Sequence, residues 1–204
     1  MNYLAHIYLS GDDEEVIIGN FIGDFVKGHF FNQYTQSIRK GIILHRYIDS
    51  FTDTHAIVRR SKLRLNEKYH KYSGIIIDIL YDHFLVKNWP QYSITPLDEF
   101  IKKFFDLANR YFDILPDSVK FFLPSFIKNN WMKSYDTIEG IQDVLMRMSS
   151  RTSLPDNTEF AMAVLRRDYD LFEAEFQAYF PALVTYVTKT FGIKLMEEKI
   201  TKNT

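Results

Sequence analysis

Histidine and aspartate residues recur at helical spacing in the segment GIILHRYIDSFTDTH, residues 41–55. His45 and Asp49 lie four positions apart, and Asp49 and Asp53 repeat that spacing, so a helix would present all three on one face. The neighbouring residues are mostly apolar, and a charge is costly to bury unless it is paired. We therefore expect this face either to be wet or to use its charges in binding or catalysis.

A second segment, GIIIDILYDHF at residues 74–84, has a similar composition. Asp78 and Asp82 are four positions apart there, and His83 follows Asp82 directly. Both segments are otherwise apolar, so both helices are expected to face the core. Two core helices with facing carboxylates and imidazoles suit a divalent metal ion.

Two further polar residues occur in apolar surroundings near the start of the chain. Asp24 lies in the stretch GNFIGDFVKG, and His6 lies in MNYLAHIYLS. Gly19 and Gly23 are four positions apart beside Asp24, a spacing that would allow another backbone to approach closely.

Each of these residues also has a plainer explanation. His6 alone is typical of a hydrogen-bonded core histidine, and Asp53 could simply end a helix. Asp78 could be a buried partner for an arginine, and His45 and Asp49 could form a surface ion pair. Burying so many such groups without counter-charges would nevertheless cost several kcal/mol each.

A metal or anion site is therefore predicted within residues 1–90. The chain has no cysteine, so His, Asp and Glu must supply any ligands. Such a nitrogen and oxygen set suits Mn, Fe, Mg or Zn, and a bound metal can lower the pKa of water and polarise a phosphoryl oxygen. Arg46 could bind a phosphate beside His45, or could equally pair with an aspartate.

The elements that position these residues are predicted to be helices. The chain has 204 residues and few Gly and Pro residues, with 8 and 6 respectively, and apolar residues recur at helical spacing. We predict one all-α domain over residues 1–196 and a polar tail over 197–204. The expected helices cover residues 10–27, 34–52, the basic region after His55, 73–87, a region beginning with Thr95 as N-cap, a region opening at Pro116 with a kink at Pro124, 136–150, and 157–191 with a break near Pro181.

Composition limits the possible functions. The net charge of −1 argues against a general nucleic-acid-binding protein. The first ten residues lack the basic and apolar regions of a signal peptide, and no apolar stretch is long enough to span a membrane. We therefore expect a cytoplasmic protein without a membrane partner, while the oligomeric state stays open.

Four ordered sequence blocks resemble one known family. They are N-x-L-A-H at residues 2–6, G-N-x-x-x-D-F-V-K-G at 19–28, H-R-x-I-D-x-x-T-D at 45–53 and D-x-x-x-D-H-F-L at 78–85. Together these blocks and their spacing resemble the acyl carrier protein phosphodiesterases. The resemblance continues more thinly through Trp131, Tyr135, Glu139, Gly140 and Arg151.

The resemblance implies an all-α fold similar to the HD-type metal-dependent phosphohydrolases. It implies hydrolysis of the phosphodiester that joins 4'-phosphopantetheine to the serine of holo-acyl carrier protein, with Mn²⁺ or a similar divalent ion (Mg²⁺, Fe²⁺ or Zn²⁺). HD enzymes are named for an adjacent His-Asp pair. Here His45 and Asp49 are four positions apart, and Asp82-His83 has the reverse order.

We therefore assign ligands from the residues themselves. Asp24, His45, Asp49 and Asp82 are expected to hold the metal, with His6 or His83 completing the set. Asp53 or Asp78 would orient a ligand by hydrogen bonding. The predicted catalytic residues are Asp24, Asp49 and Arg46, with Arg46 balancing charge on the phosphoryl oxygens.

Acyl carrier proteins are acidic, so a basic docking surface is expected. The segment RRSKLRLNEKYHK, residues 59–71, has six Lys and Arg residues against one Glu. Such a concentration of charge would speed encounter with an acidic protein, although a solvated helix face is an equal alternative. The predicted docking residues are Arg59, Arg60, Lys62, Arg64 and Lys68.

Two other functions stay open. The chain could be a phosphohydrolase of the same type acting on a nucleotide or another phosphoester. It could also be a non-enzymatic helical binding protein in which the acids and histidines form a buried polar network.

Overall fold

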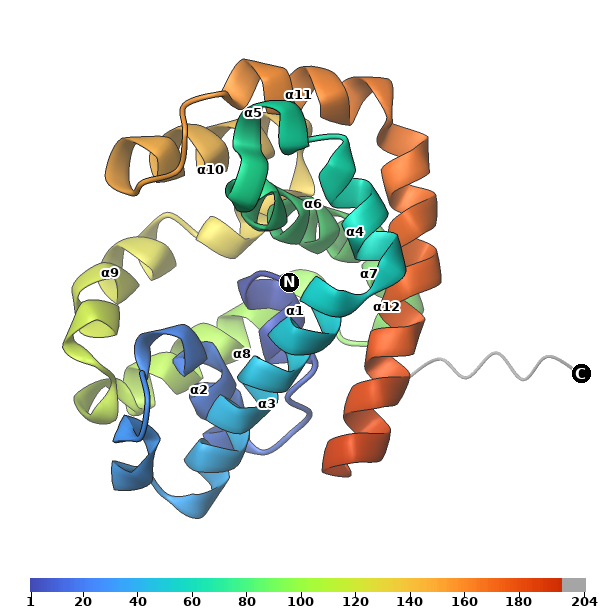
Figure 1. Cartoon of the computed structure of the whole chain (residues 1–204). Coiled ribbons are helices and arrows are strands. Elements are labelled where there is room, and N and C mark those ends of the chain that lie inside the picture. The colour runs from blue at the N-terminus through green and yellow to red at the C-terminus, as the bar shows by residue number, and fades with distance from the viewer. Residues whose placement is uncertain (196–204) are drawn as a thin grey trace, which may run out of the picture.

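The computed structural model describes residues 1–195, and regular structure within them is entirely helical (Figure 1). This confirms the predicted all-α class, whereas the predicted tail, 197–204, lies outside the described residues. The α-helices are α1 (Tyr3–Tyr8), α2 (Glu14–Phe21), α3 (Gln36–Thr54), α4 (Ala56–Leu63), α5 (Asn66–Tyr69), α6 (Ser73–Lys87), α7 (Trp89–Tyr92), α8 (Leu97–Arg110), α9 (Asp117–Lys128), α10 (Ile138–Arg151), α11 (Thr158–Arg167) and α12 (Tyr169–Phe191). The 3₁₀ helices are η1 (Gly23–Phe25), η2 (Phe30–Gln33), η3 (His70–Tyr72), η4 (Phe112–Ile114) and η5 (Trp131–Asp136).

One hydrophobic core joins the N-terminal helices to the C-terminal ones. Helix α6 lies at its centre and is buried almost continuously from Ile76 to Val86. Helix α12 runs along one side of the molecule (Figure 1). Its buried residues include the aromatic side chains of Phe176 and Phe180. Among the described helices, none has both the length and the apolar character needed to cross a membrane.

Close packing of α2 on α3 places the chemically interesting residues. A Cβ atom added to Gly41 of α3 would lie 2.2 Å from the carbonyl oxygen of Val16, and one added to Gly19 of α2 would lie 2.0 Å from that of Ile38. Neither position has room for a side chain, so the two backbones meet only because both residues are glycine. The close approach expected at Gly19 is thus confirmed.

The first predicted helix, residues 10–27, begins later in the structure than expected, because Asp13 is its N-cap. The Asp13 carboxylate accepts hydrogen bonds from the amides of Glu15 and Val16, which begins α2 at Glu14. The Ser10 hydroxyl instead donates to the carbonyl of His6 in α1. Helix α2 ends at Phe21, well before the predicted end near Lys27, and the chain continues into η1.

Two further predicted boundaries are wrong for local reasons. Thr95 is not the N-cap of α8, a position that Pro96 takes, and the carbonyl of Thr95 instead accepts the Trp89 indole N–H at 2.8 Å. The last helical region breaks at Asp168 rather than near Pro181. Pro181 is exposed, so solvent can satisfy the backbone group that it leaves unpaired, and buried neighbours hold α12 in place.

A Gly41→Ala substitution tests whether the contact between α2 and α3 is as tight as the distances indicate. Alanine favours a helix interior by about 1 kcal/mol over glycine. The added methyl at position 41 would nevertheless force the helices apart, so we expect a net loss of about 1–3 kcal/mol in the free energy of unfolding.

The matched control is Gly74→Ala in α6, where the new methyl meets only the flexible end of Lys62 at 3.3 Å. Urea unfolding of both variants should show destabilisation at position 41 and none at position 74. Equal stability of the two variants would contradict the close packing.

Candidate metal centre

Four polar side chains from three helices converge at the end of η1. The Nε2 atom of His6 lies 3.3 Å from Asp49 Oδ1, and the Nε2 atom of His45 lies 3.2 Å from Asp49 Oδ2 and 3.3 Å from Asp24 Oδ1. The ligand atoms of His6, His45 and Asp49 all lie within 4.8 Å of one another. We refer to His6, Asp24, His45 and Asp49 as the His–Asp cluster.

Asn20 of α2 orients both imidazole rings of the cluster. Its side-chain oxygen accepts a hydrogen bond from His6 Nδ1 at 2.8 Å, and its backbone oxygen accepts one from His45 Nδ1 at 2.8 Å. Its side-chain nitrogen donates to the carbonyl of His6 and to the hydroxyl of Ser10. These two bonds orient the side-chain amide so that its oxygen faces the His6 ring. Both Nδ1 atoms therefore carry the proton, and both Nε2 atoms face the carboxylates.

The two rings stack with their centroids 4.1 Å apart, so their Nε2 atoms point in a similar direction. In the neutral form of each imidazole, the lone pair of Nε2 points toward a carboxylate oxygen. The nitrogen and the oxygen then repel each other unless a cation lies between them. The buried Nε2 atom of His45 makes no hydrogen bond within the described structure. Two imidazole nitrogens and two carboxylates also match the ligands that Mn²⁺, Fe²⁺ or Zn²⁺ prefer, so the residues fit a divalent metal.

The carboxylates of the cluster also favour the protonated form of His45, so a bound metal ion would replace that proton on Nε2. Burial disfavours the charged form of His45, but Asp24 and Asp49 overcome this effect and raise its pKa to about 9. Burial and the neighbouring His45 lower the pKa of His6. Burial opposes the charge on Asp49, yet His45 and His6 hold the pKa of its carboxyl well below the usual value. Asp49 is therefore ionised at neutral pH.

Backbone geometry brings Asp24 to the cluster. The 3₁₀ helix η1 passes so close to α3 that a Cβ atom on Gly23 would lie 2.3 Å from the His45 ring. The side chain of Asp24 is 71% exposed, whereas that of His45 is 7% exposed, so Asp24 forms the solvent side of the cluster. The neighbouring His45 imidazole lowers the pKa of Asp24.

Arg46 fixes the loop that follows Asp24. One of its guanidinium nitrogens donates to the carbonyls of Val26 at 3.0 Å and Gly28 at 3.3 Å. The guanidinium also lies over the Phe31 ring, 5.2 Å from its centroid. The predicted contact between Arg46 and a phosphate thus competes with three contacts to this loop.

Asp82 and His83 do not belong to the group of close ligand atoms. The buried Asp82 carboxylate accepts hydrogen bonds from the backbone amides of Asn2 and Leu4, so it anchors the start of the helix that carries His6. Burial raises the pKa of Asp82 to about 7. His83 has both ring nitrogens engaged, with the carbonyl of Tyr135 at 2.7 Å and the hydroxyl of Tyr169 at 2.8 Å.

Asp53 and Asp78, expected to orient a ligand, bond to other groups. Asp53 pairs with Lys62 at 2.6 Å on the surface. Asp78 accepts from the α-ammonium group of Met1 at 2.8 Å rather than from an arginine. The residue that does orient cluster histidines, Asn20, was not singled out by its sequence, although a polar residue within the apolar stretch VIIGNFIG is itself a signal.

The basic segment is largely neutralised by neighbouring acids. Buried Glu175 of α12 pairs with Arg60 at 2.8 Å and with Arg64 at 2.7 Å, and it also accepts a hydrogen bond from Ser61. Lys62 pairs with Asp53, as described above, and Lys68 lies 3.6 Å from Glu67. Of the predicted docking residues, Arg59 is exposed and has no ion pair to a described acid.

A cleft of about 470 Å³ opens beside the cluster and has Asp24 in its wall. Trp131 and Tyr135 of η5 line it, as do Arg147 and Arg151 of α10. We call it the α10 cleft. It is the place from which a substrate could reach the solvent side of the cluster.

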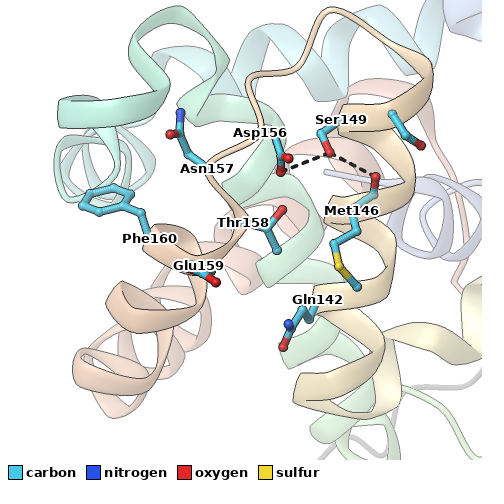
Figure 2. Close-up of a pocket in the computed structure, with 9 residues that line it drawn as sticks. Gln142, Met146, Ser149, Asp156, Asn157, Thr158, Glu159 and Phe160 are labelled. Carbon is cyan, nitrogen blue, oxygen red and sulfur yellow. Dashed lines mark hydrogen bonds between the residues drawn. The ribbon is translucent and has the colours of Figure 1, made fainter.

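A second cavity, of about 620 Å³, lies between α10 and the start of α11 (Figure 2). Ser149, Asp156 and Glu159 are among its polar lining residues, and the Ser149 hydroxyl bonds to the carbonyl of Met146 and lies 3.5 Å from Asp156. None of the residues of the His–Asp cluster lines this cavity. Its size alone therefore gives it no role in the chemistry of the cluster.

Comparison with known proteins identifies relatives over most of the chain. Residues 1–183 match the family model described as acyl carrier protein phosphodiesterase. An acyl carrier protein phosphodiesterase of Klebsiella pneumoniae (strain 342) is 32% identical over 192 residues, which cover 90% of this chain and 96% of the relative. One of Escherichia coli (strain K12 / DH10B) is 31% identical over 197 residues, covering 93% and 98%. No solved structure matches this chain significantly.

The orienting role of Asn20 predicts a specific loss of metal affinity. An Asn20→Ala variant removes the acceptor for His6 Nδ1 while keeping the backbone acceptor for His45. We expect its affinity for Mn²⁺, measured by competition with a chelator, to fall about 10- to 100-fold.

The matched control is Asn88→Ala, which removes another buried asparagine whose amide bonds to Phe84 and Glu173. This variant should lose stability without losing Mn²⁺ affinity. Unchanged affinity in Asn20→Ala, with its fold verified by circular dichroism, would remove Asn20 from the site.

Proposed function

The chain belongs to the acyl carrier protein phosphodiesterase family, and on that premise we propose that it hydrolyses holo-acyl carrier protein. The bond cleaved is the phosphodiester between the serine of the carrier and 4'-phosphopantetheine, and the products are apo-acyl carrier protein and free 4'-phosphopantetheine. The observation that carries the proposal is the His–Asp cluster, whose exposed member Asp24 faces the α10 cleft. Family membership favours this enzyme over a non-catalytic helical binding protein.

We further propose that the cluster holds a divalent metal, with Mn²⁺ as the first choice and Mg²⁺, Fe²⁺ or Zn²⁺ as alternatives. His6 and His45 would bind it through Nε2, and Asp49 and Asp24 through carboxylate oxygens. A metal at this place supplies a Lewis acid for a phosphoryl oxygen and lowers the pKa of a water molecule. We also propose that the chain is related to the HD-type phosphohydrolases, because its cluster likewise consists of histidine and aspartate side chains.

The residues of the chain have distinct tasks in the proposed reaction. Asn20 keeps both imidazoles in the Nδ1–H form, so that Nε2 stays available. Asp24, on the open side, can accept a hydrogen bond from the attacking water and orient it toward phosphorus. The attack breaks the bond between phosphorus and the serine oxygen, which leaves in line and takes up a proton.

The position of the scissile bond also limits how the carrier protein docks. The bond lies at the root of the prosthetic arm, so the surface around the carrier's serine must come close to Asp24. Because Glu175 holds Arg60 and Arg64, these two residues contribute less free charge to docking than the sequence suggests. Arg59, which is exposed and forms no ion pair with a described acid, remains the proposed docking residue with free charge.

Asp49→Asn provides the direct test of the site. It keeps the size of the side chain but weakens the interaction with both imidazoles, so we expect turnover of holo-acyl carrier protein to fall at least about 100-fold. The mass of the carrier after incubation with Mn²⁺ reports the reaction as the loss of one phosphopantetheine.

Asp106→Asn is a suitable control, because Asp106 is an exposed helical aspartate that forms an i, i+4 ion pair with Lys102 on the surface of α8. It should retain full turnover. Wild-type turnover in Asp49→Asn would contradict the site, and an intact carrier with the unaltered, metal-loaded protein would contradict the substrate. A parallel screen of small phosphodiesters and nucleotides then tests the alternative phosphohydrolase.

A further inference from the structure

One face of α10 lines the α10 cleft, whose wall also includes Asp24. Val144, Arg147, Met148 and Arg151 all line the cleft, and their spacing of three, four and seven positions places them on one side of the helix. This face of α10 therefore presents both apolar side chains and two guanidinium groups to the cleft.

The two arginines have no acidic partner among the described residues. The ion pairs of residues 1–195 include neither Arg147 nor Arg151, in contrast to Arg60 and Arg64, which both bind Glu175. The guanidinium of Arg147 lies over the Trp131 ring, 4.7 Å from its centroid, so it is held in place without being neutralised. Positive charge on this wall is therefore available to a ligand.

Arg46, which follows His45 in the sequence, is not free to bind a ligand in this way. Arg46 bonds to two loop carbonyls and does not line the cleft. Its guanidinium is committed to the backbone that positions Asp24. An anion that enters the cleft therefore meets Arg147 and Arg151 rather than Arg46.

We infer that Arg147 and Arg151 hold the negative charge of the substrate phosphodiester, and that the apolar wall around Trp131 and Met148 receives the uncharged pantetheine arm. This inference rests on the proposed function and adds the residues that select its substrate. Arginine suits the task because its planar group donates two parallel hydrogen bonds to phosphoryl oxygens. The pantetheine arm offers apolar dimethyl and methylene groups that match the Trp131 and Met148 surface.

Binding of two ligands that differ by one phosphate tests the inference. Calorimetric titration with 4'-phosphopantetheine and with pantetheine compares the unaltered protein with an Arg147→Met/Arg151→Met double variant. We expect the double variant to lose about 10- to 100-fold in affinity for 4'-phosphopantetheine, with little change for pantetheine. Arg166→Met, which removes an exposed arginine of α11 away from the cleft, should bind both ligands as the unaltered protein does.

Equal affinity of the double variant and the unaltered protein for 4'-phosphopantetheine would overturn the inference. So would an equal loss for both ligands, since the arginines would then shape the wall rather than bind the phosphate, and so would the absence of binding to the unaltered protein. If the double variant fails to fold, Arg151→Met alone serves, because Arg151 is exposed at the last position of α10.

The same preparations separate this inference from the proposed function. Mn²⁺ content should be unchanged in the double variant, because neither arginine touches the His–Asp cluster. If the unaltered protein leaves holo-acyl carrier protein intact but still discriminates the two ligands through the arginines, the proposed function fails and the phosphate site stands. If the unaltered protein does cleave the carrier but the arginines do not discriminate the two ligands, the proposed function stands and the phosphate site fails.

Discussion

The proposed site depends on two hydrogen bonds that Asn20 accepts, one from each histidine of the cluster. Its side chain holds the His6 ring and its backbone carbonyl holds the His45 ring, so one residue of α2 sets two rings from α1 and α3. Without these bonds either imidazole could turn its protonated nitrogen toward Asp49. With them, both Nε2 atoms point toward Asp49, where we propose that a cation binds.

The packing around Asn20 explains why the surrounding residues are so constrained. Gly19 and Gly41 allow α2 and α3 to meet backbone to backbone, and Gly23 allows η1 to pass over the His45 ring. Asp82 fixes the start of α1 through two backbone amides, so a buried acid of α6 positions His6 indirectly. Asp82, whose residue type suits a metal ligand, thus holds the backbone that positions the His–Asp cluster instead of joining the cluster.

The sequence predicted the helical class and the placement of His45 and Asp49 on one face of a single helix, because helical spacing is a local property. It could not tell which acids of different helices meet, because that depends on tertiary packing. Asp82 and His83 have the same residue types as the cluster but bind backbone and hydroxyl groups instead. The basic segment shows the same limit, since Glu175 lies far along the chain and neutralises Arg64 only in the folded protein.

We propose that His6 and His45, oriented by Asn20, present Nε2 to a divalent metal together with Asp49. The most direct measurement is anomalous X-ray diffraction from crystals grown with Mn²⁺, using the scattering edge of manganese to locate the ion. We expect one strong peak within bonding distance of His6 Nε2, His45 Nε2 and a carboxylate oxygen of Asp49. A peak at Asp82 or His83, or a fully loaded protein with no peak at the cluster, would contradict it.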